Sequence, residues 1–343
     1  MANPVLIEVT RGDLVESRHR GALAVVGPRG QALLSVGDTS APVYPRSAVK
    51  ILQAIPLVTS GAADAFGFGD RELALACSSH NGEPRHVDLA AAMLARAGLD
   101  ASALECGAHA PSLDRAAREL VMTGVKPSPL HNNCSGKHAG MLAVARHLDE
   151  PATGYVQPAH RVQVRIAKVM AELTGAPVST DVCGIDGCSV PTWALPLQAW
   201  AKALAQLAAS SGYQTEAIVA GRRLMASCMA EPAFVAGENR FCTEVMAALP
   251  GAVFVKTGAE GVFCGAVPSL GIGIALKIDD GATRASEAAM AGLLDRLFPG
   301  NGKVLRRWSD RIVRNVAGSA AGAIRLEPEF ARTLQTASSL PNQ

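Results

Sequence analysis

The stretch VYPRSAVKILQAIPLV, Val43 to Val58, places Ser47 three residues before Lys50 at the start of an apolar run with helical spacing. A serine in this position can cap a helix by accepting an otherwise unpaired backbone N–H. A Ser-x-x-Lys pair at a helix start also puts both side chains on one face, which suits a nucleophile and its base. Other segments of the chain have to distinguish these two interpretations.

The composition is that of a globular protein with a sizeable core, since 49% of the 343 residues are hydrophobic. The net charge is +2 and aromatic residues make up 4%, so we expect no nucleic-acid partner. No uninterrupted apolar run approaches the ~18 residues that span a bilayer. Glu8 and Asp13 stand where a signal peptide would be apolar. We therefore expect a cytoplasmic protein with no membrane partner.

The order of strand-like and helix-like segments predicts the architecture. Val- and Leu-rich runs predict strands at residues 5–12 and a hairpin at 22–37. Helical spacing dominates 47–229, strand patterns return at 251–281, and a closing helix is expected at 282–298. The fold class that follows is α/β of the α+β kind, with an antiparallel sheet built from both chain ends and a helical lobe inserted between them.

These patterns also predict how the chain divides. Residues 1–58 and 236–343 are expected to form the lobe that contains the sheet. Residues 59–235 are expected to form a mainly helical lobe within a single catalytic unit. The polar segment 333–343 is expected to be frayed.

Two further segments carry chemistry that suits the Ser47–Lys50 pair. Lys256 opens a Lys-Thr-Gly sequence on a predicted strand, and Ser78 and Ser79 lie in a polar loop after an apolar helical segment. A Ser-x-x-Lys pair, a serine loop and a late Lys-Thr-Gly follow one another in this order in serine β-lactamases and penicillin-binding proteins. A serine–lysine nucleophile therefore becomes the favoured interpretation.

The eight cysteines fall into two groups. Four lie in alanine-rich or helix-like surroundings, where a free cysteine usually behaves as a small buried hydrophobe. Cys134 and Cys188 lie among glycines, and two thiolates from separate loops are a plausible start of a zinc site. They fall short of the four ligands of a structural site, and His131 or His138 could equally be a core histidine. Cys183 precedes Cys188 by five residues, and its role stays open.

Five segments together resemble the rhizobial-type, or class 3, L-asparaginases of the asparaginase II family: YPRSAVKILQAIPL, CSSHNGEP, HNNCSGKHAGML, CGIDGCSVP and KTGAEG. The resemblance runs from about Pro4 to Phe330. It implies a fold similar to serine β-lactamases and glutaminases, and a homodimer.

The resemblance also implies a set of site residues. Two Ser–Lys pairs act side by side, a zinc ion is held by two cysteines and a lysine, and three more side chains lie near the substrate. By motif match the pairs are Ser47 with Lys50 and Ser79 with Lys256, the zinc ligands are Cys134, Lys137 and Cys188, and the substrate-binding residues are Arg46, His138 and Asp186.

The expected activity is hydrolysis of L-asparagine, a small-molecule substrate, to L-aspartate and ammonia through an acyl-enzyme. Lys50 would take the proton of Ser47, while Ser79 and Lys256 would relay it to ammonia. A glutaminase remains an alternative, because one methylene in the substrate is worth only about 1–3 kcal/mol. A β-lactam-reactive enzyme would share the Ser/Lys chemistry. A non-catalytic zinc-binding module would need only the cysteines and would leave both Ser–Lys pairs unexplained.

Overall fold

The computed structural model describes residues 2–210, 212 and 214–341. The chain forms two compact units. Unit 1 comprises residues 1–43, 196–209 and 257–343, and unit 2 comprises 44–195 and 210–256. The division at residues 58 and 236 that the sequence suggested stays a prediction.

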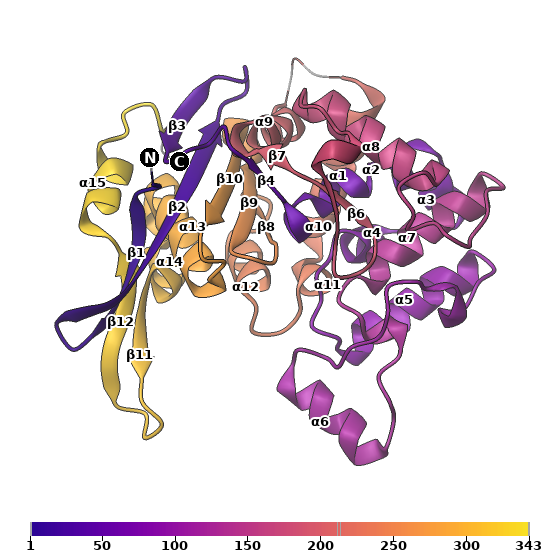
Figure 1. The fold of residues 1–343 in the computed structure, drawn as a ribbon, viewed down its shortest axis with the longest axis horizontal. Helices are drawn as coiled ribbons and strands as arrows, with labels where there is room; N and C mark the ends of the chain where they lie inside the picture. The colour runs from indigo at the N-terminus through magenta and orange to yellow at the C-terminus, as the bar shows by residue number, and fades with distance from the viewer. Residues whose placement is uncertain (1, 211, 213, 342–343) are drawn as a thin grey trace. The chain divides into compact units, whose positions relative to one another are not determined.

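An antiparallel sheet organises unit 1 (Figure 1). In the described residues its strands follow the order β11-β12-β1-β2-β10-β9-β8, with β3 paired to β2. The strands are β1 Val5–Arg11, β2 Leu14–Val26, β3 Ala32–Val36, β8 Phe254–Thr257, β9 Val262–Val267, β10 Ile272–Ile278, β11 Asp310–Arg314 and β12 Ala320–Leu326. Of these, β8 belongs to unit 2 except for its last residue, Thr257. The sheet is built from both chain ends, as predicted.

The strand pairings show how distant segments meet. β1 pairs with β12 at Ile7 and Leu326, and β2 pairs with β10 at Ala24 and Ala275. β9 and β10 are buried almost throughout, which explains why they read as continuous apolar runs. The helices of unit 1 are α9 Leu197–Ala208, α13 Thr283–Leu297, α14 Gly302–Ser309 and α15 Pro328–Thr336.

Two features of unit 1 differ from the sequence-based prediction. The strands β11 and β12 were not expected, because most of their residues are exposed or half-buried and so lack an apolar signal. The tail was expected to be frayed, but α15 extends to Thr336, and Leu334 and Leu340 are buried. For residues 333–341 the prediction was wrong, because two buried leucines pack this polar segment against the rest of the chain, and residues 342 and 343 lie outside the described residues.

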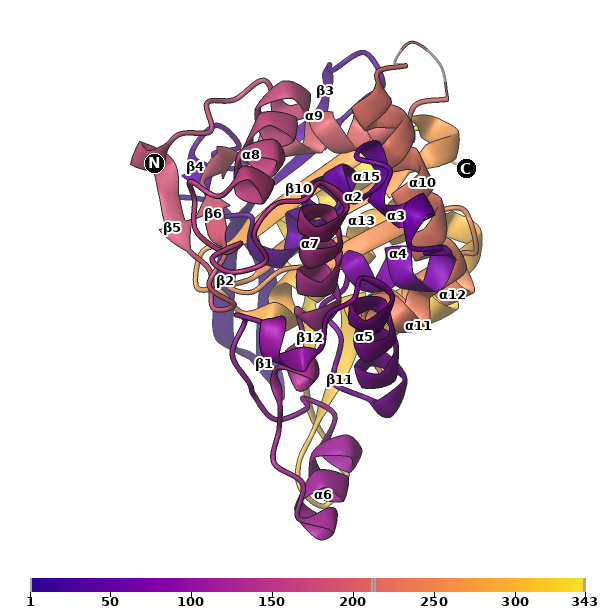
Figure 2. The same cartoon turned by 90° about the vertical axis from the view of Figure 1, so that its right-hand side faces the viewer.

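Unit 2 is mainly helical, and Figure 2 shows α7, α4 and α5 as neighbours, in agreement with their packing contacts. Its helices are α1 Lys50–Gln53, α2 Ile55–Thr59, α3 Ala62–Ala65, α4 Asp70–Ala76, α5 Pro84–Arg96, α6 Asp114–Thr123, α7 Ser135–His147, α8 Arg161–Thr174, α10 Glu216–Ala230, α11 Pro232–Val235 and α12 Phe241–Ala248. A short ribbon is formed by β5 Cys183–Ile185 and β6 Pro191–Trp193. Two more strands are β4 Pro42–Val43, which belongs to unit 1, and β7 Leu195–Pro196, which contains the boundary between the two units.

Two helices of unit 2 end at a glycine. Gly124 and Gly175 follow α6 and α8 with φ of 68° and 67°, the left-handed conformation that ends a helix.

Among the helices of the described residues, none combines the length and the apolar composition that a membrane-spanning helix needs.

Candidate active site

All ten site residues implied by the sequence lie in unit 2. They come from the 3-10 helix η1 Arg46–Val49, from α1, from the loop after α4, from the start of α7, from the turn after β5 and from the strand β8. The site can therefore be described within one compact unit.

Ser79 lies between two buried lysines. The Nζ of Lys50 is 3.1 Å from the Oγ of Ser79, and the Nζ of Lys256 is 2.8 Å from the same oxygen. Lys50 and Lys256 are 0% and 1% exposed, so both side chains are shielded from bulk water. A hydroxyl can accept two hydrogen bonds and donate one. A neutral amine at either position could instead take the hydroxyl proton and activate Ser79 as a nucleophile.

The loop after α4 fixes this arrangement. The backbone N–H of Ser79 donates to the carbonyl of Val235 at 2.9 Å. Lys50 donates to the carbonyl of Ser78 at 2.5 Å and to the Sγ of Cys134 at 3.0 Å. The Ser78 hydroxyl is buried and has no hydrogen-bond partner among the described residues. The amine of Lys50 is thus held by three groups from two segments.

Ser47 is placed differently from the expectation. It lies in the 3-10 helix η1, Arg46–Val49, and its carbonyl accepts the backbone N–H of Lys50. Its half-buried side chain makes no hydrogen bond to Lys50 in the described part of the chain. The helix-cap interpretation is wrong, because Pro45 precedes η1 and no side chain caps it. The catalytic role of Ser47 stays a prediction.

Arg46 has an unusual backbone conformation. Its φ of 49° is in the left-handed region, which non-glycine residues rarely adopt. Its side chain makes an ion pair with Asp186, with a shortest N–O distance of 2.9 Å. Burial raises the pKa of Asp186, but the charges of Lys137 and Arg46 outweigh it, so the net pKa is below its usual range. Two opposite charges therefore stand side by side next to Ser47.

Cys134, Lys137 and Cys188 form a buried cluster. The Nζ of Lys137 is 3.1 Å from the Sγ of Cys188, and the side chains of the two cysteines are hydrogen-bonded. The bond from Cys188 and the nearby lysine charges lower the pKa of Cys134 well below its ordinary value, although burial opposes them. The same bond and burial raise the pKa of Cys188. The pKa values of the two thiols are therefore shifted in opposite directions, and Cys134 is the more acidic of the two.

A close helix approach brings this cluster to Ser79. Gly136 lies in the first turn of α7, and a Cβ placed on it would be only 2.4 Å from the carbonyl oxygen of Leu75 in α4. No other residue type fits such a contact without a shift of one helix. Gly136 therefore lets the start of α7, with Cys134 and Lys137, lie against the end of α4, which leads into Ser79.

The donor set of the cluster suits zinc. Two sulfurs and one amine nitrogen converge, and zinc prefers such ligands, leaving a fourth position for water or substrate. Within the described ranges no group of three or more His, Cys, Asp and Glu side chains could hold a metal. A zinc ion here would therefore need Lys137 as its third ligand. Burial lowers the pKa of Lys137, but the charges of Cys188, Cys134 and Asp186 raise it above its usual value, so binding would displace a proton.

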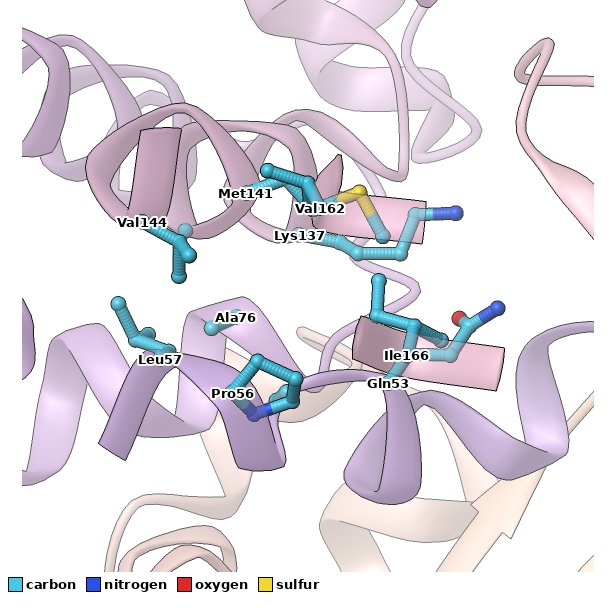
Figure 3. A pocket seen from close by; sticks show the side chains of 11 residues that line it. Gln53, Pro56, Leu57, Ala76, Lys137, Met141, Val144, Val162 and Ile166 are labelled. Carbon is cyan, nitrogen blue, oxygen red and sulfur yellow. The ribbon is translucent and has the colours of Figure 1, made fainter. Parts of the chain in front are cut away.

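Lys137 reaches the cluster along the wall of a small apolar cavity of about 10 Å³. Figure 3 shows the nitrogen ends of Lys137 and Gln53 at one end of this cavity and the apolar side chains of Leu57 and Val144 at the other. The aliphatic stem of a lysine packs well against apolar surface while its amine seeks a polar group. The cavity wall thus directs the Lys137 amine towards Cys188.

His138 follows Cys134 by one helical turn on α7 and is fully buried. Its Nδ1 is 2.7 Å from the hydroxyl of Tyr155, and its Nε2 has no partner among the described residues. Tyr155 and the Ser78 carbonyl were missed from the sequence. Neither lies in a recognisable motif of its own, and a backbone carbonyl leaves no signal in residue type.

A serine held by two buried lysines beside a cluster of sulfur and amine donors is the kind of site that an amidohydrolase uses. The family model described as L-asparaginase II matches residues 7–326. The chain belongs to this family, which confirms the resemblance and makes a small-molecule amide the class of substrate.

Solved structures add only distant likenesses. A comparison with curated proteins gives no match. A β-lactamase from Mycobacterium bovis has 14% identity and a TM-score of 0.32, covering 78% of this chain and 89% of its own. The protein Mglu has 17% identity and a TM-score of 0.37, with coverages of 85% and 71%. A simvastatin synthase mutant from Aspergillus terreus has 9% identity and a TM-score of 0.30, with coverages of 76% and 86%.

Proposed function

We propose that the protein hydrolyses L-asparagine to L-aspartate and ammonia through a serine acyl-enzyme. The observation that carries this proposal is the position of the Ser79 hydroxyl, within 3.1 Å of Lys50 and 2.8 Å of Lys256. Membership of the L-asparaginase II family supports the choice of an amide substrate.

The chemistry follows from these three side chains. A neutral lysine takes the proton of the Ser79 hydroxyl as its oxygen attacks the side-chain amide carbon of asparagine. The C–N bond breaks, the leaving nitrogen receives the proton and departs as ammonia, and an ester to serine remains. Water then attacks this ester with the same lysine as base, releasing aspartate and the free hydroxyl. In this proposal Ser79 takes the attacking role expected of Ser47.

The ion pair of Arg46 and Asp186 suits the common part of an amino acid. A guanidinium binds a carboxylate through two parallel hydrogen bonds, and a carboxylate attracts an ammonium. The α-carboxylate of asparagine would bind Arg46 and its α-ammonium would bind Asp186, in place of the contact between these two side chains. The left-handed φ of Arg46 favours a binding role, since strained residues are enriched at such sites.

Cys134, Lys137 and Cys188 would hold the zinc ion that the family resemblance implies. When bound, zinc supplies a positive charge that can orient an oxygen of the substrate. The residues themselves place Lys50, because the Sγ of Cys134 is one of its three hydrogen-bond acceptors. Zinc content, a homodimer and a cytoplasmic location are further parts of the proposal, which metal analysis, sedimentation and cell fractionation can test.

One assay distinguishes asparagine hydrolysis from glutamine hydrolysis and from β-lactam turnover. Purified protein with added zinc is incubated with L-asparagine, L-glutamine or a chromogenic β-lactam, and ammonia or ring opening is measured. We expect ammonia from asparagine at a rate at least about tenfold above that from glutamine, corresponding to roughly one methylene of discrimination. Faster glutamine hydrolysis would make the protein a glutaminase, and turnover of the β-lactam alone would overturn the proposal.

A further inference from the structure

Tyr155 contacts His138, a buried residue of the candidate site whose Nε2 has no hydrogen-bond partner among the described residues. Its hydroxyl accepts the backbone N–H of Glu105 at 3.0 Å and lies 2.7 Å from the Nδ1 of His138. The Tyr155 carbonyl accepts the side-chain amide of Gln163 at 2.8 Å, and Gly154 donates to the Glu105 carboxylate at 2.6 Å. Tyr155 is therefore fixed at its hydroxyl, at its backbone and through its neighbour.

These contacts leave two ways to place the protons. If His138 carried its proton on Nδ1 and donated it to Tyr155, the tyrosine O–H would have no acceptor and the buried Nε2 would have no donor. If Tyr155 donates its proton to Nδ1, only the Nε2–H of His138 is left without a partner among the described residues. Each unpaired buried polar group costs about 1–3 kcal/mol, so the second arrangement is favoured. Burial also raises the pKa of Tyr155, so its phenol keeps the proton that it donates.

We propose that Tyr155 is a positioning residue that holds His138 as the Nε2–H tautomer, a neutral hydrogen-bond donor for a carboxylate oxygen of the substrate. The substrate in this inference comes from the proposed function, whereas the tautomer of His138 does not depend on that function. His138 lies one turn after Cys134 on α7, on the face that carries the cluster. A neutral N–H can bind a carboxylate oxygen but cannot accept a proton from an ammonium group.

The direct test is the tautomer of His138. Protein labelled with 15N-histidine is compared with the Tyr155→Phe variant by NMR, and the His138 signals are assigned from their loss in His138→Gln. We expect Nε2 to carry the proton in the unmodified protein and a mixture of tautomers in Tyr155→Phe. A proton on Nδ1 in the unmodified protein, or an unchanged tautomer in the variant, overturns the proposal whether or not asparagine is the substrate.

The second test measures the consequence for binding. Tyr155→Phe should raise the KM for asparagine by about tenfold while kcat falls less than about threefold, because the lost contact is to a non-reacting oxygen. Thr174→Val is the matched control. The Thr174 hydroxyl also donates to a backbone carbonyl, Met170 at 2.6 Å, and accepts a backbone N–H, Ala176 at 3.2 Å. It should lower thermal stability similarly but leave KM unchanged.

The outcomes of the kinetic test are distinct. A rise of KM in both variants would show a structural effect only, and a fall of kcat at constant KM would show that His138 faces the reacting carbonyl; either result overturns the carboxylate assignment. If the unmodified protein releases no ammonia from asparagine, the proposed function fails, while the NMR measurement still decides the role of Tyr155.

Discussion

At the scale of single residues, the Ser79 hydroxyl is the centre of the candidate site. Both lysines that the motifs single out contact it, whereas Ser47 has no side-chain hydrogen bond in the described residues. The motifs indicated which residues carry the chemistry. They could not show which serine Lys50 would contact, because Ser79 lies 29 residues further along the chain and only the folding of the loop after α4 brings it to the lysine.

The first prediction compares the two serines. Ser79→Ala should lower asparagine turnover by at least about 100-fold, since it removes the hydroxyl that both Lys50 and Lys256 contact. Mass spectrometry after rapid acid quenching should find the aspartyl ester on the peptide that contains Ser79. The circular dichroism spectrum serves as the control for folding. An ester on the Ser47 peptide, with near-normal turnover of Ser79→Ala, would return the attacking role to Ser47.

The second prediction concerns the zinc ligands. Cys134→Ser and Cys188→Ser should each lower bound zinc well below one ion per chain, because each removes one of two sulfur donors. Cys183→Ser is the matched control, since Cys183 lies on β5 five residues before Cys188 and its thiol contacts the carbonyl of Gly184. Elemental analysis of the three purified variants checks this. Full zinc in both ligand variants, or none in the unmodified protein, would count against the site.

At the scale of elements, the contact between α7 and α4 brings the start of α7, with Cys134 and Lys137, close to the loop that carries Ser79. Gly136 and Gly140 lie on α7 one turn apart, yet of these two only Gly136 is tightly enclosed. A Cβ on Gly140 would be 3.3 Å from a methyl group of Leu57 and 3.4 Å from the Cβ of Ala76, which small adjustments can accommodate. The two glycines thus offer a paired test of one helix contact.

The third prediction uses this pair. Gly136→Ala should destabilise the protein by about 1–3 kcal/mol through overpacking and should also lower activity, because the shift of α7 moves Cys134 away from Lys50. Gly140→Ala should be neutral or stabilising by up to about 1 kcal/mol, since alanine favours a helix. Urea unfolding and asparagine turnover are measured for both. Equal effects of the two substitutions would refute the close approach at Gly136.

At the scale of the whole molecule, the strand and helix order was predictable and the peripheral strands were not. The runs at β1, β9, β10 and the second half of β2 are apolar because they are buried, so periodicity found them, whereas the exposed first half of β2 was missed. β11 and β12 pair through their backbones with little burial of side chains, and such pairing produces no apolar pattern in the sequence. Tyr155 escaped prediction for a related reason, since the two groups that contact its hydroxyl, on Glu105 and His138, are 50 and 17 residues away in the sequence.

The fourth prediction concerns the stability of the whole chain against pH. His80 and His86 are buried and stacked, with ring centroids 4.8 Å apart. Burial, followed for His80 by the charge of His86, lowers the pKa of both histidines below 6.5. Below about pH 6.5 the unfolded chain therefore binds protons that the folded chain excludes, and the free energy of unfolding decreases. We expect a loss of about 1–3 kcal/mol between pH 7.5 and 5.5.

Urea unfolding at both pH values measures this loss. His86→Phe keeps a ring in the stack but takes up no proton, so its unfolding free energy should change less over the same interval. The interval from pH 5.5 to 7.5 lies above the range in which carboxylates titrate, so a change in unfolding free energy within it is assigned to histidines. An unfolding free energy that is independent of pH in the unmodified protein would contradict the prediction.

The sheet that joins both chain ends has a consequence for the protein during its synthesis. The hairpin of β1 and β2 leaves the ribosome early, but β1 receives β12 and β2 receives β10 only after some 250 to 300 further residues have been added, as the numbers of their paired residues show. Lys256, the last of the candidate site residues, is translated before β9, β10 and β12. The catalytic groups are therefore complete in the nascent chain while the edges of the first hairpin are still unpaired. Unpaired strand edges favour aggregation and non-local pairing is slow, so chaperone capture of the nascent chain is expected to be needed most before residue 326 is made.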